Sequence, residues 1–94
     1  MTTRTATMLF LDANGAPVDV PDAVADVFYF TSSGARVWVL PQGSAMTKVP
    51  GETGRYAVSF DVPNAVRTVY STMYGTDPTT GYRLVNEQQV LKWR

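Results

Sequence analysis

The sequence contains no cysteine and no histidine. Without cysteine the chain has no disulfide bond or thiol nucleophile, and without histidine it lacks the side chain of most acid–base relays and zinc sites. A charge excess of one sign is lacking too, because eight Lys and Arg residues balance eight Asp and Glu residues. This balance argues against general binding to nucleic acid or to anionic membrane surfaces.

Long apolar runs are also missing. The longest strongly apolar runs, residues 8–11 and 27–30, span four residues each, whereas a membrane-spanning helix needs about 20. The N-terminal residues have no apolar stretch of the kind that forms a secretory signal. We therefore expect neither a membrane segment nor a targeting signal.

The chain is expected to form a single domain over residues 1–94, because 94 residues leave no room for a second one. Hydrophobic residues make up 45% of it, which is enough for a packed core. Turn signals rich in Gly, Pro, Asn and Asp recur along the sequence, and the segments between them are rich in Val, Thr, Tyr, Phe and Trp. This pattern is typical of a β-sandwich or barrel.

The sequence predicts an all-β fold, an antiparallel β-sandwich of about seven strands. The expected strand segments are residues 5–11, 16–20, 24–30, 35–40, 45–49, 55–61, 66–74 and 83–92. Helices compete poorly, because β-branched and aromatic residues dominate and no apolar stripe at helical spacing is sustained. A short helical turn near residues 21–24 is the one alternative.

The clearest strand is predicted over residues 55–61. Tyr56, Val58 and Phe60 alternate with polar or small residues, so they fall on one face of this strand. The preceding turn, residues 51–54, begins and ends with glycine and is expected to lead directly into this strand of the core. We therefore expect Tyr56, Val58 and Phe60 to be buried.

A second pattern covers segments 24–30 and 35–40, which a Thr-Ser-Ser-Gly hairpin connection joins. Both segments carry apolar side chains on both faces, and a small domain has one core in which to bury them. The face left over is expected to contact another chain, because exposed apolar patches of this kind mark interaction sites. The expected interface residues are Phe28, Phe30, Arg36, Trp38 and Leu40.

Groups that could carry catalysis or bind metal are sparse. Asp12 and Asn14 precede Gly15 in the spacing that opens a calcium loop, but the later ligands are missing and a hairpin turn is favoured. Glu52 and Glu87 could form a carboxylate pair, yet both occupy ordinary turn or strand positions. We therefore predict a protein that is not an enzyme and has no metal site and no cofactor.

Two stretches carry a resemblance to known modules. Residues 51–63 comprise a turn, a Thr-Gly-x-Tyr strand and a proline, and residues 11–18 comprise a strand end, Asn-Gly and Pro-Val. In these features the chain resembles small immunoglobulin-like or transthyretin-like β-sandwich modules, and the resemblance implies that the predicted β-sandwich is immunoglobulin-like. It is similar to those encoded among tailed-bacteriophage structural genes, which serve in capsid decoration, in the neck or collar, or in the tail and baseplate.

The resemblance implies a non-catalytic virion structural protein that assembles in the host cytoplasm and binds other virion structural proteins, in many copies per assembly. The alternative is a carbohydrate- or surface-binding β-sandwich module. Exposed aromatic rings can stack on sugar rings, so that alternative would be favoured by a single exposed row of Trp38, Tyr70, Tyr74 and Tyr82.

Overall fold

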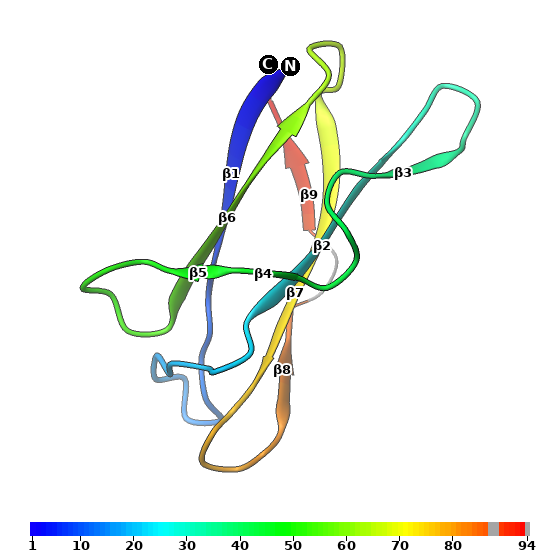
Figure 1. Cartoon of the computed structure of the whole chain (residues 1–94). Coiled ribbons are helices and arrows are strands. Elements are labelled where there is room, and N and C mark those ends of the chain that lie inside the picture. The colour runs from blue at the N-terminus through cyan, green and yellow to red at the C-terminus, as the bar shows by residue number, and fades with distance from the viewer. Residues whose placement is uncertain (87–88, 94) are drawn as a thin grey trace.

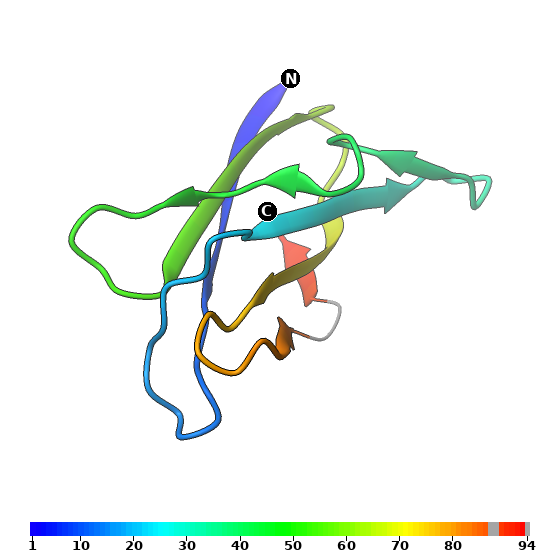
Figure 2. The same cartoon turned by 60° about the horizontal axis from the view of Figure 1, so that its bottom comes forward.

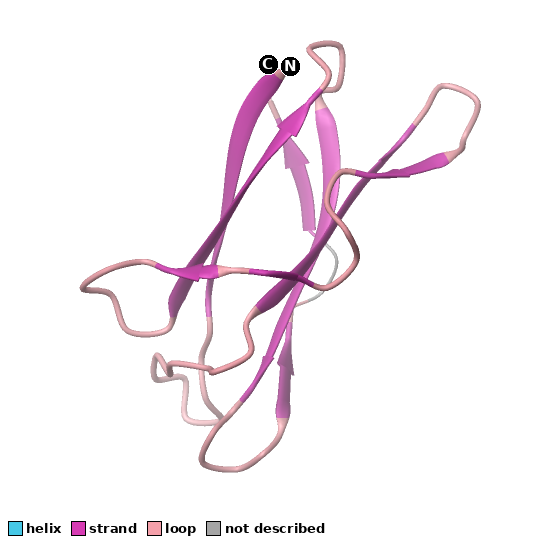
Figure 3. Ribbon diagram, in the orientation of Figure 1, coloured by secondary structure: helices cyan, strands magenta, loops and turns pink. Residues whose placement is uncertain are grey.

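The computed structural model describes residues 1–86 and 89–93, and these residues form strands, turns and loops (Figure 1; Figure 3). The strands are β1 (Thr2–Leu9), β2 (Val24–Phe30), β3 (Arg36–Trp38), β4 (Ser44–Ala45), β5 (Thr47–Lys48), β6 (Arg55–Val62), β7 (Thr68–Thr76), β8 (Arg83–Val85) and β9 (Gln89–Lys92). No helix forms among the described residues, so the predicted all-β fold is confirmed. Residues 21–22, the expected site of a helical turn, form a simple turn before β2.

Two antiparallel sheets make up the predicted β-sandwich (Figure 2). The smaller sheet has the strand order β1-β6-β5. The larger sheet has the order β3-β2-β7-β8, with β4 also pairing with β2 and β9 also pairing with β7. The central strands β2, β6 and β7 are long, and the strands that flank them are short except for β1.

The hydrophobic core lies between the two sheets. In β6, Tyr56, Val58 and Phe60 are buried, as the alternation in the sequence predicts. Val27 from β2 and Met73 from β7 belong to the same cluster and have no exposed surface. Each fully buried side chain of this size contributes about 1.5–3 kcal/mol through removal of its apolar surface from water. This cluster is therefore the main source of stability.

Three of the predicted strands do not form as single strands. Residues 16–20 are not a strand and contribute only an isolated bridge between Leu11 and Pro17. Residues 45–49 divide into β4 and β5, which belong to different sheets, and residues 83–92 divide into β8 and β9. The described residues therefore form nine strands, where the sequence predicts about seven. Prolines at positions 17 and 21 lack the N–H that a ladder needs, which explains the missing strand.

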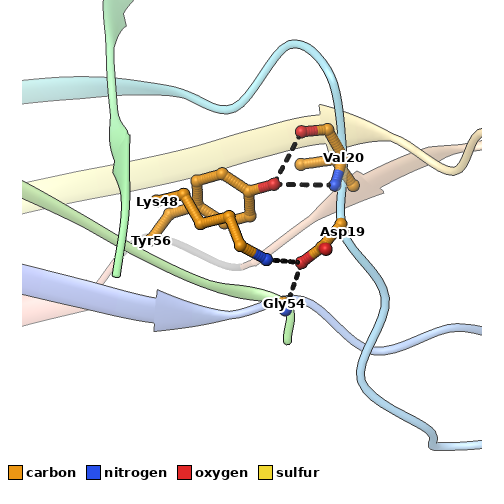
Figure 4. A network of polar contacts seen from close by, with 5 residues as sticks. All are labelled: Asp19, Val20, Lys48, Gly54 and Tyr56. Carbon is orange, nitrogen blue, oxygen red and sulfur yellow. Dashed lines mark hydrogen bonds and ion pairs between the residues drawn. The ribbon is translucent and has the colours of Figure 1, made fainter. Parts of the chain in front are cut away.

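Side chains fix the segment that replaces the missing strand and carries the chain from one sheet to the other (Figure 4). One oxygen of the Asp19 carboxylate accepts hydrogen bonds from Lys48 Nζ at 2.6 Å and from the Gly54 amide at 2.7 Å. The Tyr56 hydroxyl donates to the Val20 carbonyl at 2.8 Å and accepts from the Val20 amide at 3.0 Å. These bonds satisfy backbone groups that a strand ladder would otherwise pair.

The Asp19 contacts predict how stability depends on pH. Hydrogen bonds from Lys48 and from the Gly54 amide hold the pKa of Asp19 below its usual value of 3.8. The unfolded chain then binds more protons than the folded chain between the two pKa values, so the Asp19 contribution is present above pH 3.8 and is lost as the pH falls through the folded value.

We expect the urea midpoint of the wild type to fall more between about pH 5 and about pH 2 than that of Asp19→Asn, which carries no titrating group at this position. The urea midpoint should still fall somewhat in both proteins, because Asp22 is present in each. Hydrogen bonds from the Thr76 side chain and amide lower the pKa of Asp22 as well. The same pH dependence in wild type and Asp19→Asn would contradict this assignment.

Candidate functional site

Strand β2 turns four of its side chains away from the core. Ala25 and Val27 are fully buried between the sheets, so the alternating residues Phe28 and Phe30 project from the opposite, outer face of the larger sheet. The hairpin to β3 forms as predicted: the Thr31 amide donates to the Ala35 carbonyl at 2.8 Å.

The strand register extends this outer face across four strands. Phe28 pairs with Trp38 of β3 on one side and with Tyr70 of β7 on the other. Tyr70 in turn pairs with Val90 of β9. Side chains at paired positions point to the same face of a sheet, so Trp38, Phe28, Tyr70 and Val90 form one row across it.

The rings of this row pack against one another. The Phe28 ring lies 5.3 Å from the Trp38 ring and stacks on the Tyr70 ring at 5.7 Å. Phe30 contacts Phe28 at 5.6 Å and Tyr70 at 5.4 Å, edge to face in both cases. These distances and angles are those that aromatic pairs prefer, so the rings form one fixed cluster.

Arg36 covers the middle of this cluster. Its guanidinium carbon lies 4.6 Å from the centre of the Phe28 ring, 5.6 Å from that of Trp38 and 6.0 Å from that of Phe30. No carboxylate of the described residues lies within ion-pair distance of Arg36. The guanidinium is therefore held by cation–π contacts, and its charge is not compensated by the part of the chain described.

We use the term aromatic face for the set Phe28, Phe30, Arg36, Trp38, Tyr70 and Val90. Phe30 is 45% exposed, Trp38 38% and Val90 50%, while Phe28 is buried beneath its neighbours. The structure thus brings together four of the five residues expected at an interface.

Leu40 is the fifth, and it does not join the aromatic face. It packs partly against the hydrophobic core, as Val39 does. The alternation on which its placement was based stops where β3 ends, at Trp38. Tyr70 and Val90 were missing from the expected interface because they join through strand pairing, which the sequence does not display.

Three polar side chains, those of Asp26, Tyr74 and Arg83, lie on the same outer face, toward the start of β2. Burial and the neighbouring Asp26 carboxylate raise the pKa of Tyr74. Asp26 also accepts a hydrogen bond from the Gly43 amide at 2.7 Å, and the Arg83 guanidinium lies 5.1 Å from the Tyr74 ring. Asp26 is therefore engaged within the chain, while the Arg83 charge lies over a ring.

A cleft of about 410 Å³ adjoins the aromatic face. It lies between the β2–β3 hairpin and the β6–β7 connection and is lined by residues 29–32 and 65–68. Arg67 is the one charged residue in its lining, and its guanidinium donates a hydrogen bond to the Asn64 carbonyl. The lining therefore supplies no pair of carboxylates for acid–base chemistry.

The other chemical candidates from the sequence are placed as follows. Asp12 accepts hydrogen bonds from the Asn14 and Ala16 amides at 2.9 and 3.0 Å, which is the turn geometry favoured over a calcium loop. Glu52 forms an ion pair with Arg55 at 3.4 Å, and Glu87 lies outside the described residues. No group of three or more acidic residues that could hold a metal ion occurs in residues 1–86 and 89–93.

The four aromatic residues that would favour carbohydrate binding do not share one row. Trp38 and Tyr70 lie in the aromatic face, Tyr74 lies further along β7, and Tyr82 is 72% exposed in the loop before β8. None of the described residues belongs to a helix long and apolar enough to cross a membrane. No protein-family model matches the chain, and neither a curated protein nor a solved structure shows significant similarity to it.

Proposed function

We propose that this protein is a non-catalytic structural module that binds neighbouring subunits of a larger assembly through its aromatic face. The observation that carries the proposal is the row of packed rings beneath Arg36, with Phe30, Trp38 and Val90 each more than a third exposed. The resemblance noted in the sequence makes a tailed-phage virion the proposed setting, with other virion proteins as the partners.

The composition of the aromatic face supports this role. Aromatic residues and arginine are enriched at the centres of protein interfaces, and a few such residues supply most of the binding energy. The rings are held by one another, so little side-chain freedom remains to be lost when a partner covers them. Burial of Phe30 and Trp38 by a partner is therefore expected to contribute most of the binding free energy at this face.

The charge on the aromatic face indicates what a partner presents to it. The Arg36 guanidinium lies over the Phe28 ring and has no ion pair among the described residues, so a partner can supply an acceptor for its N–H groups. Lys92 pairs with Thr68 next to this row and adds a second positive charge. A partner surface that combines apolar side chains with a carboxylate complements both features.

Sedimentation velocity tests the proposal. We expect the purified chain, mixed with the products of adjacent genes, to form a complex with one of them between roughly 10 µM and 1 mM. Trp38→Ser should weaken this complex by about tenfold or more, since it removes a central ring. The matched control is Tyr82→Ser, which removes an exposed ring outside the aromatic face and should leave the complex unchanged.

Two results would oppose the proposal. One is a wild-type chain that forms no complex with any product of the adjacent genes across this concentration range. The other is a glycan array in which the wild type binds sugars and Trp38→Ser does not, which would favour the carbohydrate-binding alternative, because Trp38 and Tyr70 flank Phe28 in one row.

A further inference from the structure

Strand β1 forms an edge of the smaller sheet that differs from the other sheet edges. It is eight residues long and pairs with β6 on one side, and no described strand pairs with its other side. The remaining flanking strands, β3, β4, β5, β8 and β9, have two to four residues each. Long unpaired edges invite pairing with another chain, which is why most edges in proteins are short.

The hydrogen bonds around β6 reveal which β1 residues face this edge. The Val49 amide donates to the Arg55 carbonyl, so odd-numbered residues of β6 turn their backbone groups toward β5. The Phe10 amide donates to the Gly54 carbonyl, so even-numbered residues pair across to β1. By the alternation of antiparallel ladders, the odd-numbered residues of β1 direct their N–H and C=O groups away from β6.

These outward-facing residues are Thr3, Thr5, Thr7 and Leu9, and little protects them. β1 contains no proline and no lysine, which are the residues that commonly guard an edge. Its one charged residue, Arg4, turns toward the core side, where its guanidinium lies 4.9 Å from the Trp93 ring. The backbone of β1 therefore presents a row of unpaired donors and acceptors beside uncharged side chains.

We propose that β1 pairs with β1 of a second copy of this chain, antiparallel and about a twofold axis at Thr5. In this register Thr5 lies opposite the partner's Thr5, and Thr3 lies opposite the partner's Thr7. Arg4 lies opposite the partner's Ala6, so the two arginines do not face each other. Cross-strand threonine pairs are favourable and like charges directly opposite are not.

The neighbouring registers are less suitable. A shift of one pair in one direction sets Arg4 opposite the partner's Arg4, and a shift in the other sets Thr3 opposite the partner's Leu9. The outward-facing residues of β1 carry no charge that would select an oppositely charged foreign strand, and the carboxylate beside them, that of Asp61 in β6, already accepts a hydrogen bond from the Thr3 hydroxyl at 2.6 Å. The twofold arrangement covers two unprotected edges at once. The product is a continuous sheet of the order β5-β6-β1-β1-β6-β5.

This inference does not rest on the proposed function, because β1 and the aromatic face belong to different sheets. A chain that uses both surfaces can contact two neighbours at once. Pairing through β1 would therefore link subunits into the multiple-copy assembly proposed above by a second, independent contact.

Sedimentation equilibrium of wild type, Thr5→Pro and Thr5→Val tests the pairing between roughly 10 µM and 1 mM. Proline at position 5 removes an N–H that points away from β6, so the β1–β6 ladder stays intact while pairing with a second copy is blocked. We expect wild type and Thr5→Val to dimerise and Thr5→Pro to dimerise at least about tenfold more weakly. Trp38→Ser should dimerise like the wild type.

Amide hydrogen exchange of the wild type gives a readout that needs no variant. Exchange at Thr3, Thr5 and Thr7 should slow as the concentration rises, while the amides of Arg4 and Ala6, bonded to β6, should be protected at every concentration. A monomeric wild type, or dimers equally stable in Thr5→Pro, would overturn the inference. Dimers lost in Trp38→Ser but not in Thr5→Pro would overturn it while supporting the aromatic face.

Discussion

Phe60→Ala is expected to lower the free energy of unfolding by about 3–5 kcal/mol. Phe60 lies in the second half of β6, is only 3% exposed, and belongs to the hydrophobic cluster between the sheets. Its ring also contacts the Trp93 ring edge to face at 6.2 Å. The substitution therefore leaves a cavity and removes support from Trp93, which in turn lies under Arg4.

Urea unfolding of wild type, Phe60→Ala and Tyr82→Ala measures this loss. Tyr82 is 72% exposed, so its truncation should change stability by less than about 0.5 kcal/mol. A loss below about 1 kcal/mol in Phe60→Ala would mean that this ring is not part of a close-packed core.

The long central strands could be predicted from the sequence because one face of each strand is buried by the chain itself. In β6, every second residue from Tyr56 to Phe60 lies in the core, so the alternation of apolar and polar residues matches the alternation of burial. β2 was predicted with its observed bounds as well. For such strands the alternation of apolar residues in the sequence is enough to predict which side chains are buried.

The short strands could not be predicted in this way. Residues 16–20 contain apolar residues at strand-like spacing, but Val20 is held by Tyr56 and Asp19 holds Lys48 and Gly54. These partners lie far along the chain, and their side chains take the place of a ladder. β4 and β5 adjoin in sequence yet pair in different sheets, because the chain crosses between the sheets at this point.

The candidate site was predictable within one hairpin and not across the sheet. Phe28, Phe30, Arg36 and Trp38 share a face because they alternate within β2 and β3. Tyr70 enters the same row through the pairing of β2 with β7, which joins residues more than forty positions apart. A strand pattern gives the face of each residue, whereas only the register shows which strands place their residues side by side.

Gly54→Ala is expected to be the most harmful of the glycine substitutions in this chain. Gly54 has a φ of +77°, and a Cβ there would lie 2.8 Å from the Phe10 carbonyl oxygen and 2.9 Å from the Val18 amide nitrogen. These two atoms are hydrogen-bonded to each other at 3.0 Å, so neither moves away freely. The backbone conformation costs about 1–2 kcal/mol for a residue with a Cβ, and the crowding costs about 1–3 kcal/mol more.

Gly51→Ala is the matched control, because Gly51 has the same φ of +77° and no atom within 4 Å of the position of a new Cβ. It should lose about 1–2 kcal/mol of unfolding free energy in urea, from the backbone conformation alone, against about 2–5 kcal/mol in Gly54→Ala. The difference in unfolding free energy between the two variants measures the cost of crowding a new Cβ against the backbone of Phe10 and Val18 at the start of β6. Equal losses would show that residues 10 and 18 make room for a side chain at no cost, and that their close approach to Gly54 does not constrain the fold.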